Sequence, residues 1–134
     1  MASIIDIEGI GPVYKEKLNA VGVKTTEQLL WLGASPRGRE ELAADADIPE
    51  KLILEWVNLA DLMRIKGVGE EYSDLLEEAG VDTVKELRVR NPDNLHEAIV
   101  KTNKVKKLVR RTPSLKQVKK WVEQAKTLPP MVTY

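Results

Sequence analysis

The sequence predicts an all-α fold made of two copies of one helical unit. Three observations support this prediction: a block of sequence occurs twice, capping residues mark the starts of helices, and no segment shows the alternation of apolar and polar residues that marks a half-buried strand. The chain has 134 residues, of which 43% are apolar and 31% charged, so it is long enough for one compact domain or two very small ones.

The repeated block lies at residues 7–29 and again, without gaps, at residues 65–87. The copies share an isoleucine, both glycines of a Gly-x-Gly pair, a tyrosine, a leucine, a Gly-Val pair, a threonine and a final leucine. Chance does not produce this similarity, so we interpret the chain as a tandem repeat. The expected domains are a first unit at residues 1–63, a second unit at residues 64–128 and an extended tail at residues 129–134.

Each copy predicts the same order of local structures. The Gly-x-Gly pair permits positive φ and a tight reversal, and a helix follows it, at residues 12–21 in the first copy and 70–79 in the second. A later glycine, Gly22 or Gly80, ends that helix. Capping boxes then begin a second, short helix: Thr25 with Gln28 in the first copy, and Thr83 with Glu86 in the second.

The segments outside the repeated block are also predicted to be helical. Apolar stripes at helical spacing indicate helices over residues 49–64 and 114–127. At three places a capping side chain stands directly before a proline suited to the first helical position: Ser35-Pro36, Asn91-Pro92 and Thr112-Pro113.

The interior is expected to be mostly aliphatic, because the chain has three Trp, three Tyr and no Phe. We expect Trp31, Trp56 and Trp121 in the core, although Trp31 is less constrained than the other two; stacking on a base is the alternative. We expect His96 to be a surface helical residue. The inward side of a helix expected within residues 101–111 is formed by Val105, Leu108 and Val109.

The charge is distributed unevenly although the net charge is zero. Residues 1–63 hold six basic and eleven acidic residues, whereas residues 64–134 hold fifteen and ten. Most of the excess lies in residues 101–126, with ten Lys or Arg and one acid, Glu123. This asymmetry favours an anionic partner for the basic half or head-to-tail self-association, and a merely solvated surface is the alternative.

The composition gives little material for catalysis. Cysteine is absent, which excludes disulfides and thiolate zinc sites, and His96 is the one histidine. The carboxylates form no recognisable catalytic pair, and neither Gly-x-Gly follows a strand as a nucleotide-binding loop would. We therefore expect no enzyme, no cofactor and no metal site.

The N-terminal residues have neither a basic region nor a long apolar stretch, so we expect no secretory signal. No window approaches the run of about 20 apolar residues that spans a bilayer. We expect a cytoplasmic protein without a membrane partner.

The repeated pattern Ile-x-Gly-Ile/Val-Gly, Tyr, Leu, Gly-Val-x-Thr, Leu resembles the helix-hairpin-helix superfamily, known from DNA repair, recombination and replication proteins. The resemblance implies two tandem helix-hairpin-helix-like units, a SAM-like helical bundle packed into one compact body. Nearly the whole chain also resembles an uncharacterised bacterial family catalogued as a domain of unknown function. That second resemblance, which implies no activity, is carried by residues 7–12, 56–69, 82–87, 90–95 and 120–125.

In nucleic-acid-binding members of the superfamily, the hairpin amides and the following helix N-terminus hold a DNA phosphate without reading bases. The implied phosphate contacts are the amides of Gly9, Ile10, Gly11, Gly67, Val68 and Gly69, with Lys15, Lys17 and Lys66 nearby. This sequence departs from the pattern, because acids flank both hairpins and a tyrosine replaces a small residue in each. The alternative is that the glycines only make the turns; a monovalent cation held by hairpin carbonyls is a weaker option.

The basic segment and the lysine face of the last helix predict a second contact surface, formed by Lys104, Lys106, Lys107, Arg110, Arg111, Lys116, Lys119 and Lys120. Such a surface neutralises phosphates without base readout. The leading expectation is therefore a non-catalytic, sequence-nonspecific module that binds nucleic acid, duplex DNA in particular. The alternative is a protein-interaction or assembly scaffold whose basic face meets an acidic partner, and a third option is an accessory domain that positions a separate enzyme.

Overall fold

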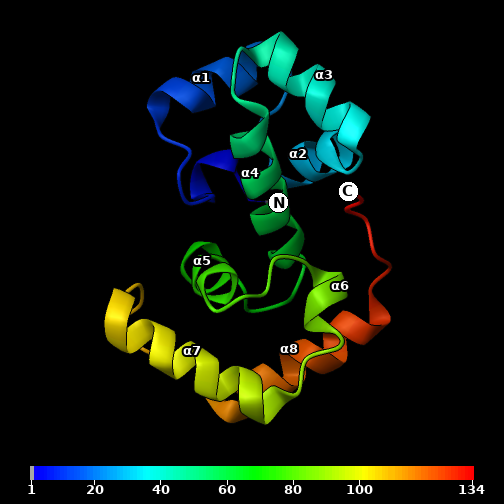
Figure 1. Cartoon of the computed structure of the whole chain (residues 1–134). Coiled ribbons are helices and arrows are strands. Elements are labelled where there is room, and N and C mark those ends of the chain that lie inside the picture. Colours follow the sequence, from blue (N-terminus) through cyan, green and yellow to red (C-terminus); the bar gives the residue numbers. More distant parts are fainter. Residues whose placement is uncertain (1) are drawn as a thin grey trace. The chain divides into compact units, whose positions relative to one another are not determined.

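The computed structural model describes residues 2–134 (Figure 1). Eight α-helices and one 3-10 helix make up its regular secondary structure, and no strand occurs in this range beyond an isolated bridge between Ser3 and Thr25. The prediction of an all-α fold is confirmed. The chain divides into two compact units: unit 1 is Met1–Asp61 with Met131–Tyr134, and unit 2 is Leu62–Pro130.

Unit 1 contains η1 (Ile4–Asp6), α1 (Pro12–Ala20), α2 (Thr26–Gly33), α3 (Pro36–Ala46) and nearly all of α4 (Glu50–Leu62). Helix α3 packs against both α1 and α2. The hydrophobic core of the unit is aliphatic except for one tryptophan, as the composition predicts. Its largest fully buried side chains are Ile4, Ile7, Leu18, Leu29, Ile53, Trp56 and Leu59.

Unit 2 contains α5 (Glu70–Glu78), α6 (Val84–Leu87), α7 (Pro92–Lys106) and α8 (Leu115–Thr127). Helix α7 packs against α5 and α8, and α6 packs against α8 (Figure 1). One hydrophobic cluster joins all four helices, with Leu75 and Leu76 from α5, Leu87 from α6, Leu95 and Ile99 from α7, and Val118, Trp121 and Val122 from α8.

The predicted capping residues begin most of the helices. The hydroxyl of Thr25 accepts from the Gln28 amide at 3.1 Å, and the Gln28 side chain accepts from the Thr25 amide in return. Ser35 and Asn91 cap α3 and α7 before the prolines predicted at their first positions. Thr83 likewise accepts from the Glu86 amide at the start of α6.

The predicted start of α8 at Thr112-Pro113 is wrong. Ser114 is the N-cap, and it forms a reciprocal capping box with Gln117. A box at Ser114 provides acceptors for two backbone amides, whereas Thr112 is followed three residues later by Leu115, which cannot complete a box. Pro113 is instead buried before the helix begins.

The two glycine turns, residues 7–11 and 65–69, have the same backbone geometry. In the first, the Ile10 amide donates to the Ile7 carbonyl at 3.1 Å, and Gly9 has φ +95°. The second repeats this with a 3.0 Å bond from Val68 to Ile65 and φ +91° at Gly67. A four-residue turn with positive φ at its third residue requires glycine there, which explains the first glycine of each pair.

A tyrosine and a tryptophan pack together beside the glycine turn in each unit. The ring centroids of Tyr14 and Trp56 lie 5.1 Å apart with an edge-on orientation, and those of Tyr72 and Trp121 lie 5.4 Å apart. Both tryptophans are buried, as predicted. The bulky tyrosine is thus part of the internal packing of each unit.

The prediction that Trp31 lies in the core is wrong, because its side chain is 76% exposed. Helix α2 buries one narrow stripe, formed by Thr26, Leu29, Leu30 and Gly33. Since these positions follow the i, i+3, i+4, i+7 spacing of a single helix face, Trp31 falls on the opposite side.

The prediction of an inward helical side at Val105, Leu108 and Val109 is also wrong. Helix α7 ends at Lys106, and Lys107 takes a left-handed conformation with φ 52°. Leu108 and Val109 therefore lie in the following loop, where Val109 is buried, while Val105 is 82% exposed.

The C-terminal residues Pro129–Tyr134 contain no helix, as expected, and their last part packs within unit 1. The Thr133 amide donates to the Ala34 carbonyl at 2.8 Å. Arg39, which is only 4% exposed, donates to the carbonyls of Gly33, Ala34 and Thr133 at 2.9, 3.0 and 2.7 Å. A buried guanidinium is therefore fully engaged with backbone oxygens.

Candidate nucleic-acid interface

Unit 2 carries exposed cations on two neighbouring helices and the loop between them, here called the basic surface. We use this name for the exposed lysines and arginines of the last turns of α7, the loop of residues 107–114 and the outward face of α8. Helices α7 and α8 lie side by side (Figure 1), so the two parts of the surface are carried by neighbouring elements. Its members are Lys101, Lys104, Lys106, Lys107, Arg110, Arg111, Lys116, Lys119, Lys120 and Lys126.

The sequence of α8 separates its two faces sharply. Val118, Trp121, Val122 and Ala125 are buried, which directs Lys116, Lys119 and Lys120 outward. These three lysines lie in the first half of the helix, and its first turn contains no acidic residue. The N-terminal end of a helix dipole disfavours positive charge within the first turn, so the stability of α8 does not explain Lys116.

The loop that carries Arg110 and Arg111 is held in place by three side chains. Asn103 bonds to both the amide and the carbonyl of Val109 at 3.0 Å. The Tyr72 hydroxyl donates to the Arg111 carbonyl at 3.0 Å. His96, expected to be a plain surface residue, is half-buried, and its Nε2 lies 3.1 Å from the Pro113 carbonyl oxygen. The arginines are therefore presented by an ordered loop.

Most cations of the basic surface have no anionic partner. Lys106 pairs with Glu78, whose hydrogen bond and charge raise the pKa of the Lys106 ammonium above its ordinary value. Lys126 pairs with Glu123 at 3.0 Å. No ion pair within residues 2–134 involves the other eight members of the surface, so their charges face solvent.

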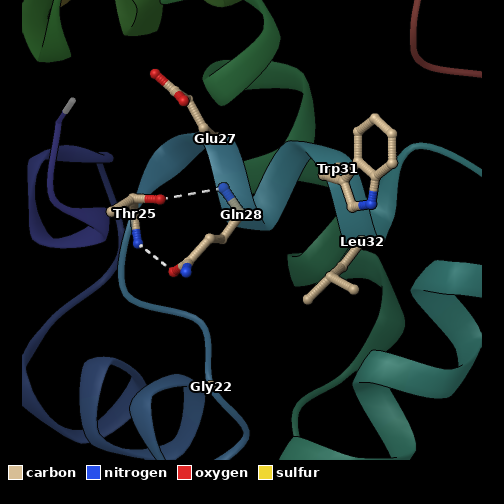
Figure 2. Close-up of a pocket in the computed structure, with 6 residues that line it drawn as sticks. All are labelled: Gly22, Thr25, Glu27, Gln28, Trp31 and Leu32. Carbon is tan, nitrogen blue, oxygen red and sulfur yellow. Dashed lines mark hydrogen bonds between the residues drawn. The ribbon is translucent and has the colours of Figure 1, made fainter.

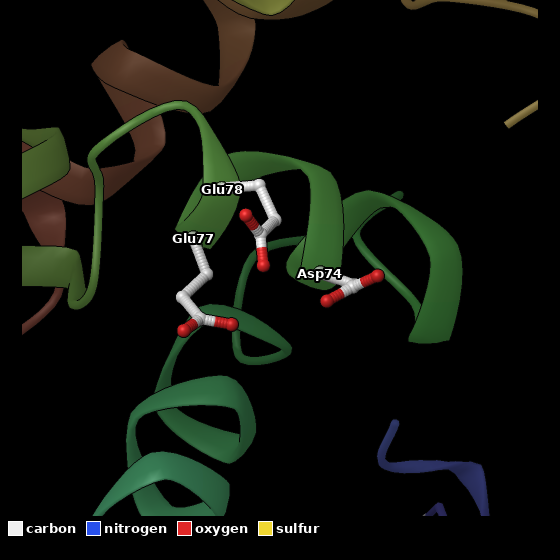
Figure 3. A group of neighbouring side chains, drawn as sticks. All are labelled: Asp74, Glu77 and Glu78. Atoms are coloured by element: carbon white, nitrogen blue, oxygen red, sulfur yellow. The ribbon is translucent and has the colours of Figure 1, made fainter. Parts of the chain in front are cut away.

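A cluster of carboxylates lies on α5 (Figure 3), and one of them pairs with Lys106 of the basic surface. Asp74, Glu77 and Glu78 each bring one carboxylate oxygen within 4.8 Å of the others. Their i, i+3, i+4 spacing is the signal by which the sequence could have predicted this grouping. Since the Lys106 ammonium bonds to Glu78 and its charge interacts with the other two, the cluster already has a cation of its own.

The six residues predicted to contact phosphate at the hairpins have three different roles in the structure. The amides of Ile10 and Val68 donate inside their turns, and both side chains are buried. Gly11 and Gly69 are the N-caps of α1 and α5, and neither helix start receives a side-chain cap. Gly9 and Gly67 occupy the positive-φ positions.

The two helix starts differ in charge. The first turn of α5 contains Glu70 and Glu71, which already complement the positive end of its dipole. The first turn of α1 contains no acid. An anion would therefore be attracted to the start of α1 more than to the start of α5.

The lysines predicted near the hairpins have separate environments. Lys17 donates to the Asp47 carbonyl at 2.9 Å and its Nζ lies 3.7 Å from the Asp47 carboxylate, so it closes the end of α3. Lys15 is partly exposed on α1. Lys66 is exposed, and its amide donates to the Gln124 side chain at 2.9 Å.

The fold and these surfaces define an all-helical protein of two small units, of which the first is acidic and the second basic. No helix within residues 2–134 has the length and apolar character needed to cross a bilayer. The chain belongs to the family described as a domain of unknown function (DUF4332), which matches residues 8–128. The resemblance to an uncharacterised family is thus confirmed. No solved structure matches the chain.

Proposed function

We propose that this protein is a non-catalytic module that binds duplex DNA through the basic surface of unit 2, without strong sequence preference. The observation that carries the proposal is the row of Lys116, Lys119 and Lys120 at the start of α8. These cations have no ion-pair partner within the described residues, and Lys116 lies in the first turn of α8, where the helix dipole opposes a positive charge. The phosphates of a polyanionic partner would neutralise the positive charges that no acidic group of the fold neutralises.

The preformed loop adds to this argument. Because Asn103, Tyr72 and His96 bond to the backbone of this loop, the backbone that carries Arg110 and Arg111 would lose little conformational freedom on binding phosphates. Guanidinium groups pair with phosphate oxygens in a bidentate manner, whereas the lysines act as point charges.

A helix-hairpin-helix-like contact at the first glycine turn would be a second, weaker phosphate site. The uncapped start of α1, its lack of first-turn acids and the nearby Lys15 support this assignment. The second glycine turn is assigned a structural role, since Glu70 and Glu71 would repel a phosphate there.

The absence of sequence preference follows from the side chains involved. The surface consists of Lys and Arg on two helix faces and a loop, and it contains no asparagine or glutamine row that would pair with base edges. Contacts to the phosphate backbone position a protein on DNA but carry no sequence information.

The test is fluorescence anisotropy with two labelled duplexes of unrelated sequence, at low salt. We expect both to bind with affinities within about threefold of each other, since no base contact discriminates between them. The variant Lys116/Lys119/Lys120→Glu should lose at least about tenfold in affinity. All three side chains are exposed, so we expect the variant to fold, and circular dichroism checks that it does.

A matched control changes the net charge equally at exposed lysines outside the basic surface: Lys24/Lys51/Lys85→Glu. With both variants compared at about 0.1 M salt, we expect this control to bind within about twofold of the unmodified protein, since exposed charges outside the contact surface are largely screened there. Equal losses in both variants, or no duplex binding at low salt, would overturn the proposal.

A further inference from the structure

Unit 1 has an exposed apolar pocket on the outward side of α2 (Figure 2). Trp31 is 76% exposed and Leu32 is 46% exposed. Together with Gly22, Thr25, Glu27 and Gln28 they line a cavity of about 440 Å³. The proposed DNA contact makes no use of this pocket, so its apolar side chains need another explanation.

The fold of unit 1 does not require these apolar side chains. The opposite stripe of α2, with Leu29 and Leu30, supplies the buried contacts. The capping box of Thr25 and Gln28 fixes the first turn of the helix and one wall of the pocket. A tryptophan and a leucine side by side on a well-ordered outer face are typical of a contact surface.

The pocket lies in an acidic setting. Glu27 lies on its rim, one helical turn before Trp31. A smaller hollow of about 160 Å³ shares Leu32 and is lined by the carboxylates Glu41 and Asp45. Unit 1 as a whole has five more acidic than basic residues. A complementary occupant therefore presents an apolar side chain between cations.

Unit 2 of this same chain presents such a group. Val105, near the end of α7, is 82% exposed, with Lys104 beside it and Lys101 one turn earlier. Neither lysine has an ion-pair partner within residues 2–134. Unit 2 also has five more basic than acidic residues, which balances unit 1.

We propose that the Trp31 pocket of one copy receives the Val105 end of α7 from a second copy. The valine would pack against Trp31 and Leu32, while the lysines face Glu27 and the face of the indole ring system. The two contact faces belong to different units, so the association is head-to-tail and can continue from copy to copy. It goes beyond DNA binding and does not depend on it.

A second exposed valine of unit 2 is a poorer match. Val89 is 78% exposed and lies between Arg88 and Arg90. Both guanidiniums are directed to carbonyl oxygens of their own unit, Arg88 to Lys126 at 3.5 Å and Arg90 to Gly80 at 3.4 Å. Val89 is therefore the matched control position for Val105.

The test is sedimentation velocity of the full chain over a wide concentration range, at ionic strengths of about 0.05 M and about 0.5 M. The unmodified protein should form concentration-dependent oligomers at the lower ionic strength and fewer at the higher one. Trp31→Ala and Val105→Glu should each sediment as monomers under both conditions, whereas Val89→Glu should associate as the unmodified protein does. All three positions are exposed, so the variants should fold.

Mixing the two defective variants tests the head-to-tail arrangement directly. Trp31→Ala retains an intact α7 end and Val105→Glu retains an intact pocket, so an equimolar mixture should form heterodimers that grow no further. A mixture that stays monomeric would overturn the arrangement. A monomeric unmodified protein at every concentration, or oligomers of Trp31→Ala alone, would overturn the role of the pocket. Since Trp31→Ala leaves the basic surface intact, its duplex affinity should equal that of the unmodified protein at concentrations where the unmodified protein is monomeric, which separates this test from that of the proposed function.

Discussion

The indole Nε1 of Trp56 lies 3.1 Å from the point that a Cβ atom on Gly9 would occupy. The same relationship joins Trp121 and Gly67, at 3.4 Å. In each unit the buried tryptophan thus closes on the glycine turn while a tyrosine packs against its ring. Gly9 is therefore required both by its positive φ and by the neighbouring indole, whereas Gly67 is required by its positive φ.

Substitutions should show that the first glycine of the pair Gly9 and Gly11 is required by the turn, whereas the second is not. Gly9→Ser should destabilise the protein by at least about 1–2 kcal/mol, because serine has a steric penalty at φ +95° and its Cβ would crowd Trp56. Gly11→Ser should be neutral or should stabilise the protein by roughly a few tenths of a kcal/mol. Gly11 is an N-cap with open space around it, and serine is a good N-cap. Urea unfolding measures both; equal losses would contradict this account of the turn.

Arg39 should be among the most sensitive polar positions of unit 1. Arg39→Met keeps most of the side-chain volume but removes the donors to the carbonyls of Gly33, Ala34 and Thr133, so we expect a loss of about 3 kcal/mol. Arg37→Met on the same helix should cost less than about 0.5 kcal/mol, because the exposed pair of Arg37 with Glu41 contributes little. Thermal unfolding of the two variants is the measurement. Similar Tm values would contradict the claim that the hydrogen bonds of the Arg39 guanidinium stabilise unit 1.

Substituting Asn103 should lower the stability of unit 2 and loosen the loop of residues 107–114. Asn103→Ala removes both bonds to Val109, so we expect a loss of about 1–2 kcal/mol and faster amide hydrogen exchange in residues 107–114. Asn94→Ala is the control on the same helix, since Asn94 is exposed. Unchanged exchange in the loop of the Asn103 variant would show that other contacts hold it.

Asp82 should make unit 2 less stable as pH rises through the acid range. Burial raises the pKa of its carboxyl above the ordinary value of 3.8, and the charge of Glu86 raises it further. Folding therefore favours the protonated form: this contribution is fully present below pH 3.8 and is lost as pH rises through the raised pKa of the folded state.

The variant Asp82→Asn should remove that contribution to the pH dependence. Its stability relative to the unmodified protein should increase between acid and neutral pH, because the asparagine never acquires the charge that burial disfavours. Urea unfolding at matched pH values measures the difference. A difference between the two proteins that stays constant with pH would contradict the raised pKa.

Local signals in the sequence were sufficient for most of the fold. Thr25, Ser35 and Asn91 begin helices where their capping chemistry indicates, and the first glycine of each turn has the positive φ that the Gly-x-Gly pair permits. These features depend on contacts within a few residues, so one sequence contains all the information that they need.

The failures concern choices between competing local signals or between helix faces. Thr112 and Ser114 both offer a cap, and only the reciprocal bond with Gln117 decides for Ser114. Residue type alone predicts Trp31 in the core, whereas the buried stripe through Leu29 and Leu30 places it outside. The inward position of Val105 depends on a helix that continues past it, whereas α7 ends at Lys106.

The site is less predictable than the fold. The basic residues were identified from charge alone, but the bonds that order the loop join residues distant in the sequence, such as Tyr72 and Arg111. The engagement of Lys17 with Asp47 is likewise a tertiary contact. The sequence therefore predicts which residues are charged, whereas the fold determines which charges are available.

The most direct test of the account is the salt dependence of duplex binding by the unmodified protein and by Lys116/Lys119/Lys120→Glu. The logarithm of the affinity should fall linearly with the logarithm of the salt concentration, with a slope of about −0.9 for each phosphate neutralised. Loss of three lysine contacts should reduce the magnitude of that slope by about 3. An affinity that does not vary with salt, or an identical slope for the two proteins, would contradict phosphate binding by the basic surface.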